Sequence, residues 1–244
     1  MAARNRFGQR MTDGPTGGPV PSPVPDASAG PLDPSDPAAL QAHPADAGDE
    51  EPVDRSAEDA LRARLVEDPN DTEAFDQLAQ IVRRIATEGH RHGDPQREAD
   101  DAVWALAEEV AGNGRAWYPL IELGRLSIDD DREAALRRLA TAADRDPTGE
   151  ALARALVTLR EAGHPVDALN LGVGHWRPRE HIVEAGRQLI EAAIEAGRHG
   201  EARRHLNALG RHEDQAGVDK VRRELESRMA QADRDTGVIP RVTT

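Results

Sequence analysis

A recurring pair of apolar residues limits the fold of this chain more than any other feature of its sequence. Most copies place a small residue one helical turn before a larger one, as in Ala135 with Leu139. The small residues stand at positions 57, 99, 135, 168 and 202, so that successive copies are 42, 36, 33 and 34 residues apart. Packed helices lie about 8–10 Å apart, and a small residue allows that approach. The pattern therefore predicts a series of helical hairpins.

The clearest unit of the series spans residues 116–147. Trp117 and Leu120 lie on the apolar face of its first helix. We expect this helix to begin three or four residues before Pro119, because proline is tolerated only in a first turn. Three consecutive aspartates then mark the turn and favour the N-terminus of the second helix. Pro147 ends the unit, because the residue before a proline is pushed out of the helical region.

Apolar residues recur at helical spacing from Ser56 onward, which predicts helices along most of the remaining chain. The expected helices are 56–67, 72–86, 149–162, 165–175, 179–196, 200–209 and 212–232, a helix that begins at residue 95 and ends before residue 112, and the two helices of the clearest unit.

These units resemble the tetratricopeptide repeat, a 34-residue helical hairpin with large and small apolar residues at set positions. In the clearest unit the matching residues are Trp117, Leu120, Ala135, Leu139, Ala142 and Pro147. Gly172 and Gly186 depart from the pattern, since each stands where a large residue is expected. The resemblance covers about residues 57–230. It implies an all-α fold, a right-handed α-solenoid of about five helical hairpins, in a domain over residues 54–233.

Two tails flank the predicted repeat domain. Ten of the chain's 17 prolines lie within residues 15–52, and residues 1–53 contain a single aromatic residue. Such a segment buries too little apolar surface to offset its chain entropy, so we expect it to be disordered. Residues 234–244 are expected to form a flexible tail. We interpret the N-terminal tail as a solvated linker or as a docking segment for a proline-reading domain or an anionic surface.

The resemblance also implies a binding surface. In tetratricopeptide proteins the first helix of each unit lines a concave groove that commonly holds an extended peptide. The corresponding positions here are Arg83, Arg84, Tyr118, Glu122, Arg125, Arg154 and Arg187, with Gln80, Thr158 and Glu191 beside them. Arginine recurs in all four first helices, and guanidinium groups bind carboxylates through paired hydrogen bonds. We therefore expect an acidic protein or peptide partner; the alternative is that these arginines only solvate the helix faces.

The sequence favours a non-enzymatic scaffold or adaptor that binds another protein. It has no cysteine, no HExxH zinc motif and no phosphate-binding loop, so we expect no catalytic residues, no cofactor and no metal. The alternatives are a regulatory subunit or a transcription-associated helical module, and a hydrolase or metal-dependent enzyme is the least favoured class. Self-association is left open by the sequence.

Charge and hydropathy narrow the partners further. The formal net charge is −14, which argues against nucleic acid, because nucleic-acid affinity comes mainly from basic side chains that neutralise phosphates. No apolar run approaches the ~18 residues that cross a bilayer, so we expect no membrane insertion and a cytoplasmic protein. Of the 31 basic residues only Lys220 is a lysine, a composition typical of a high-GC bacterium such as an actinobacterium.

Trp176 has two interpretations at this stage. It fills the space that Gly172 and Gly174 leave in the fourth unit, or it is an exposed aromatic anchor of an interface. Packing decides between them.

Overall fold

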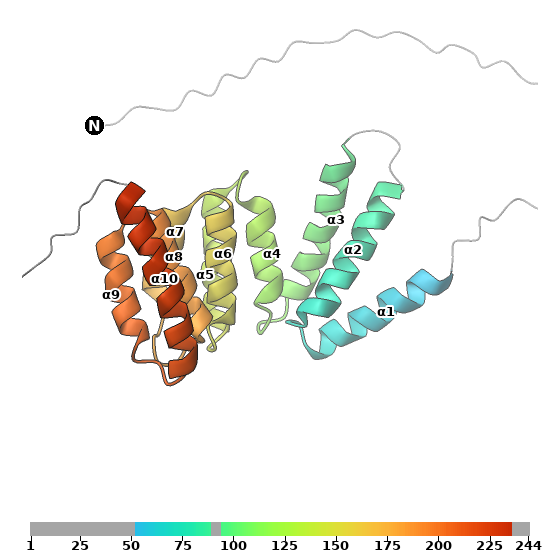
Figure 1. Ribbon diagram of the computed structural model, residues 1–244. Coiled ribbons are helices and arrows are strands. Elements are labelled where there is room, and N and C mark those ends of the chain that lie inside the picture. Colours follow the sequence, from blue (N-terminus) through green and yellow to red (C-terminus); the bar gives the residue numbers. More distant parts are fainter. Residues whose placement is uncertain (1–51, 89–93, 236–244) are drawn as a thin grey trace, which may run out of the picture. The chain divides into compact units, whose positions relative to one another are not determined.

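The computed structural model describes residues 52–88 and 94–235, and this part of the chain is all-α (Figure 1). Its ten helices pack mostly in chain order. Their bounds are α1 Pro52–Glu67, α2 Thr72–Glu88, α3 Pro95–Ala111, α4 Tyr118–Ser127, α5 Arg132–Arg145, α6 Glu150–Glu161, α7 Pro165–His175, α8 Val183–Glu195, α9 His199–Leu209 and α10 Gln215–Asp235. The all-α fold predicted from the sequence is confirmed for these residues.

Most of the two predicted tails lies outside the described residues. This applies to the segment expected to be disordered, up to residue 51, and to the flexible tail from residue 236. Helix α1 begins at Pro52, four residues before Ser56, and proline suits a first helical position because its missing N–H would have no partner there.

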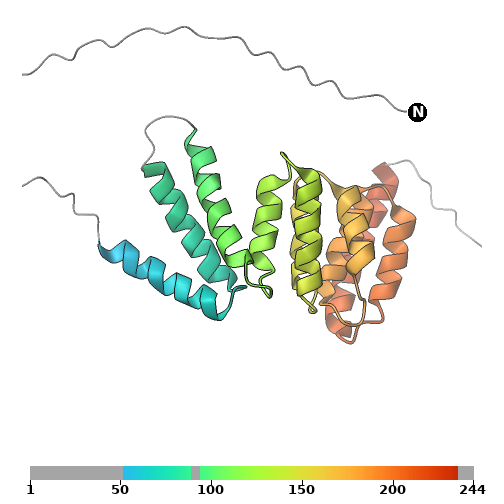
Figure 2. The same ribbon diagram turned by 180° about the vertical axis from the view of Figure 1, so that it is seen from behind.

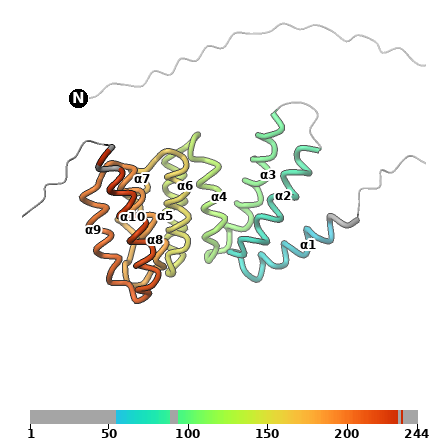
Figure 3. The backbone as a smooth tube through the Cα atoms, viewed as in Figure 1, coloured from blue at the N-terminus to red at the C-terminus, as the bar shows by residue number. Residues whose placement is uncertain are grey.

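Helices that follow one another in the chain pack as pairs. Extensive contacts join α2 to α3, α4 to α5, α6 to α7 and α8 to α9, and Figure 2 shows these pairs from behind. Further contacts join α4 to α6, α6 to α8 and α8 to α10 (Figure 3). Every second helix from α4 to α10 therefore lies beside the next one, and the residues on these helices can share a surface.

The recurring small residues bring the paired helices close together. Ala135 and Leu139 of α5 are fully buried, and a Cβ added to Gly124 of α4 would lie 2.7 Å from Leu139. Helices α4 and α5 reach this separation because Gly124 lacks a side chain. The first copy of the pattern differs: Ala57 is exposed, because within the described residues α1 packs extensively against α2 alone.

Helix α4 begins at Tyr118, later than the sequence predicts, and the reason lies 47 residues earlier in the chain. The side-chain oxygen of Asn70, in the turn between α1 and α2, accepts hydrogen bonds from the N–H groups of Trp117 (2.6 Å) and Tyr118 (3.1 Å). The Asn70 amide in turn donates to the carbonyl of Arg115 (3.0 Å). The first N–H groups of a helix lack acceptors within the helix, and the side-chain oxygen of Asn70 is the acceptor for two N–H groups at the start of α4.

Asp146 performs a similar task at the start of α6. Its carboxylate accepts hydrogen bonds from the N–H groups of Thr148 (3.0 Å) and Ala151 (2.8 Å) and from the Thr148 hydroxyl (2.8 Å). Burial alone would raise the pKa of Asp146, but these hydrogen bonds outweigh it and hold the pKa below its usual value. The carbonyl of Thr148 accepts the N–H of Ile182 (2.8 Å), and α8 begins only at Val183 instead of residue 179.

Trp176 is part of the packing, but it does not fill the space expected from the sequence. Its ring lies against Gly186, where an added Cβ would be 2.9 Å from the ring atom Cζ2. It also meets His205 edge to face, with 5.8 Å between ring centroids. Leu189 occupies the space beside Gly172 instead. Both glycines therefore mark close approaches between helices.

Candidate functional site

A groove of about 540 Å³ opens along α4, α6 and the start of α8. Its lining residues come from three elements that the packing of alternate helices brings together: Tyr118, Ile121, Glu122 and Arg125 of α4, Glu150, Ala153, Arg154, Val157, Thr158 and Glu161 of α6, and Ile182 and Glu184 at the start of α8. We call this surface the α4–α6 groove.

Tyr118 is fixed in position at one end of the groove. Its ring meets those of Phe75 and Trp117 edge to face, with centroids 5.4 and 5.8 Å away, and its hydroxyl donates to the carboxylate of Asp76 (2.7 Å). Burial raises the pKa of the Tyr118 hydroxyl far above its ordinary value, and the hydrogen bond to Asp76 raises it further. Tyr118 therefore acts as a neutral, rigid wall of the groove.

The two arginines of the groove already bond carboxylates on their own helices. Arg125 donates to Glu122 (Nε–Oε2 3.0 Å), and Arg154 donates to Glu150 (Nη2–Oε1 3.1 Å). The guanidinium of Arg154 also lies over the Tyr118 ring, 5.2 Å from its centroid. A cation above an aromatic face is attracted by the negative face of the ring, so this contact orients Arg154 toward α4.

The remaining arginines predicted for the binding surface lie outside the lining of this groove. Arg83 is half-buried on α2, and Nε of Arg84 lies 3.9 Å from the Glu88 carboxylate. Arg187 on α8 pairs with Glu184 (3.1 Å) and Glu191 (3.3 Å). The structure thus brings together four of the seven predicted residues, Tyr118, Glu122, Arg125 and Arg154, with Thr158 beside them.

Several lining residues were missed by the sequence analysis. The apolar ones are Ile121, Ala153, Val157 and Ile182, and the charged ones are Glu150, Glu161 and Glu184. On α6 the residues Glu150, Arg154, Val157 and Glu161 follow the spacing of a single helix face, so helical periodicity could have found them. Ile182 was harder to find, because it immediately precedes α8 in a segment that the sequence assigned to the helix itself.

Carboxylates outnumber guanidiniums in the groove. The four glutamates of the lining against two arginines give a formal charge of −2. Glu184 bonds Arg187 and the side-chain amide of Gln188, outside the lining. Glu161 is exposed and, within residues 52–88 and 94–235, has no side-chain hydrogen bond or ion pair. The uncompensated negative charge of the groove therefore lies at Glu161, in the last turn of α6.

A buried carboxylate lies behind the groove. Glu191 of α8 is only 4% exposed, and it pairs with Arg160 of α6 (2.6 Å), with Arg187 of α8 and with Arg228 of α10. The resemblance placed Glu191 beside the predicted binding positions, but its carboxylate faces arginines from three helices. These ion pairs tie α6, α8 and α10 together, so Glu191 has a structural role.

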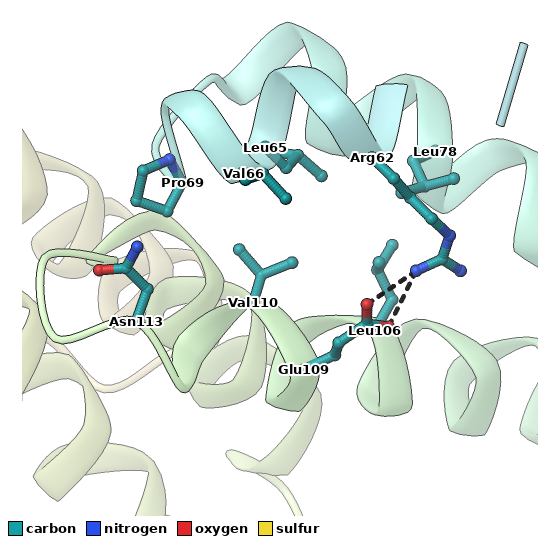
Figure 4. Close-up of a pocket in the computed structure, with 9 residues that line it drawn as sticks. All are labelled: Arg62, Leu65, Val66, Pro69, Leu78, Leu106, Glu109, Val110 and Asn113. Atoms are coloured by element: carbon teal, nitrogen blue, oxygen red, sulfur yellow. Dashed lines mark hydrogen bonds and ion pairs between the residues drawn. The ribbon is translucent and has the colours of Figure 1, made fainter. Parts of the chain in front are cut away.

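A second hollow, of about 220 Å³, lies between α1 and α3 and contains none of the predicted binding residues (Figure 4). Its lining is mainly apolar, with Leu65 and Val66 of α1 facing Val110 of α3. At one end Arg62 donates to both carboxylate oxygens of Glu109 (2.9 Å each). This ion pair joins α1 to α3. Val66, also in the lining, is 78% exposed.

The described residues contain neither a metal-binding cluster nor a membrane-spanning helix. Residues 52–88 and 94–235 contain no group of three or more histidine, aspartate or glutamate side chains arranged to hold a metal ion. In the same ranges no helix combines the length and the apolar character that a bilayer crossing requires.

Comparison of the chain with protein-family models, with curated proteins and with solved structures gives no match. The function is therefore inferred from the geometry of the α4–α6 groove.

Proposed function

We propose that this chain is a non-enzymatic scaffold, built as a tetratricopeptide-like solenoid, that binds an extended segment of another protein in the α4–α6 groove. The observation that carries the proposal is the groove itself, in which apolar side chains from α4, α6 and the start of α8 lie between charged residues. Specific protein interfaces have this composition, with an apolar centre and a polar rim.

The chemistry of the lining supports binding more than a reaction. The Tyr118 hydroxyl donates to Asp76, and the Thr158 hydroxyl donates to the carbonyl of Arg154 (3.0 Å). Burial and the hydrogen bond to Asp76 raise the pKa of the Tyr118 hydroxyl, which opposes formation of a phenolate nucleophile, and the acceptor of the Thr158 hydroxyl is a backbone carbonyl, which is not a base. The other polar lining residues are carboxylates and guanidiniums, most of them paired with each other, and such groups orient a bound chain.

A selection with random peptides tests the proposal. A phage-displayed library of twelve-residue peptides is selected on the full chain, and the selected peptides are measured against Val157→Trp, which places an indole in the middle of the groove. The matched control is Val173→Trp on α7, where the valine is 55% exposed and lies outside the groove. Circular dichroism and thermal unfolding show whether each variant retains its helices.

We expect Val157→Trp to weaken binding at least tenfold and Val173→Trp to leave it unchanged. If no selected peptide distinguishes these two variants, the α4–α6 groove is not a peptide-binding site and the proposal fails.

A further inference from the structure

We infer that the α4–α6 groove recognises a basic segment, in which an arginine or lysine pairs with Glu161 and a neighbouring apolar side chain packs on Val157. This inference rests on the proposed function and specifies the chemistry of its partner. It reverses the acidic partner expected from the sequence, which required arginines with donors turned toward the groove.

Both arginines of the groove already have carboxylate partners. Arg125 and Arg154 each bond a glutamate three or four residues away on the same helix. An acidic peptide would have to replace these glutamates, and it would bring further negative charge beside Glu161, which has no partner within the described residues. Like charges brought together oppose binding, so the lining disfavours an acidic segment.

The uncompensated charge at Glu161 lies beside an apolar side chain. Glu161 is one helical turn from Val157, so the carboxylate and the apolar side chain lie next to each other on the same face of α6. A basic side chain that reaches Glu161 therefore places its neighbours over Val157. Ile182, which is 39% exposed, offers a second apolar contact in the lining.

The charge of the whole chain acts in the same direction. With a net charge of −14 it attracts a basic segment from solution and repels an acidic one, which affects the association rate most strongly at low ionic strength. The negative charge of the groove and that of the whole chain therefore favour the same class of partner, a cationic extended peptide.

The test continues from the peptide selection. We expect the peptides that depend on Val157 to be enriched in arginine and lysine relative to the unselected library. One of them is then made as a fluorescein-labelled synthetic peptide, and its affinity is measured by fluorescence anisotropy at several salt concentrations.

The variant that tests the contact is Glu161→Gln, and Glu108→Gln on the exposed surface of α3 is the matched control. We expect Glu161→Gln to weaken binding about two- to fivefold, as for the loss of an exposed ion pair, and to reduce its salt dependence. The control should do neither. Glu161→Arg should weaken binding further, and a peptide whose basic residue is replaced by glutamate should restore binding to this variant.

Two results overturn the inference while leaving the proposed function in place. One is that the Val157-dependent peptides are acidic or uncharged, and the other is that Glu161→Gln binds them as tightly as Glu108→Gln does. If no peptide depends on Val157, the proposed function and this inference both fail.

Discussion

Replacement of Glu191 by glutamine tests how the C-terminal helices are held together. Glu191 is 4% exposed and its carboxylate pairs with Arg160, Arg187 and Arg228, which lie on three different helices. Glutamine has nearly the same shape and keeps one hydrogen-bond acceptor, but it has no charge. The substitution therefore removes the carboxylate that these three guanidinium groups share, although Arg160 keeps its ion pair with Glu195 and Arg187 keeps its pair with Glu184.

The expected loss of stability follows from the removal of a charge from a group of ion pairs that is partly shielded from water. Removing one partner of a buried ion pair costs about 3–5 kcal/mol. Because Arg160 and Arg187 keep other carboxylate partners and Arg228 is half-exposed, we take the lower end, about 3 kcal/mol. For a chain of 150–250 residues, 1 kcal/mol shifts the melting temperature by about 2–4 °C. Glu191→Gln should then lower it by roughly 6–12 °C.

The measurement is urea unfolding followed by circular dichroism at 222 nm, with thermal unfolding as a second observable. The matched control is Glu133→Gln, because Glu133 also bonds an arginine (Arg137, 2.6 Å) but its side chain is 87% exposed. Exposed ion pairs contribute little, so the control should unfold almost as the parent chain does. A loss for Glu191→Gln that is no larger than that of the control would refute the argument.

A double-mutant cycle with Arg228→Gln separates the pair from its surroundings. If the Glu191–Arg228 contact holds α10 on α8, the two substitutions together should cost less than the sum of their separate effects. Coupling energies for residues in contact are about 0.5–3 kcal/mol. Additive effects would mean that the Glu191–Arg228 pair does not help to hold α10 on α8.

Three further predictions concern the turn before α6 and the buried histidines. Asp146→Ala should lower the free energy of unfolding by about 1–2 kcal/mol in urea titration, because it removes the acceptor for the first N–H groups of α6. In the same assay, Gly149→Ala should lower the free energy of unfolding more than Gly163→Ala does. Both glycines have a left-handed backbone (φ +85° and +79°), which costs an alanine about 1–2 kcal/mol. Only at Gly149 would the new Cβ also clash, because it would lie 2.6 Å from His181. Burial lowers the pKa of His181 and His205 in the folded chain, and the positive charge of Arg177 lowers that of His181 further. As the pH falls, these histidines therefore take up protons in the unfolded chain before they do so in the folded chain. The melting temperature should therefore be independent of these histidines above pH ~6.5 and should decrease as the pH drops below that value. Replacing both histidines by glutamine should make this decrease smaller.

The helices were predictable from sequence to the extent that local periodicity determines them. Apolar residues at helical spacing identified each helix of the described region, and the small residue before a large one identified the faces that pack. Helix α4 starts later than predicted because Asn70, from a distant turn, bonds the N–H groups of Trp117 and Tyr118. A contact between residues so far apart leaves no local pattern in the sequence.

The binding surface was predictable only in part, for a related reason. Tyr118, Glu122, Arg125 and Arg154 lie on helices whose faces the period identifies, and they meet in one groove. Arg187 has the same residue type on an equivalent helix, yet it belongs to the buried pairs of Glu191. What sets Arg187 apart is its partner, the buried carboxylate of Glu191, whose surroundings depend on the packing of α10 against α8 and have no counterpart in the repeat pattern.

Burial also separates stability from recognition on these helices, although both use glutamate and arginine. Glu191 is shielded from water, so loss of its carboxylate lowers the stability of the whole fold. The α4–α6 groove is then affected only when α6, α8 and α10 separate. At Glu161 the carboxylate is solvated and has no partner within the described residues, so its loss costs the fold little and acts on whatever the groove binds. The two substitutions should therefore have opposite signatures. Glu191→Gln lowers the melting temperature with peptide affinity unchanged at temperatures where the chain is folded, whereas Glu161→Gln lowers the affinity with the melting temperature unchanged.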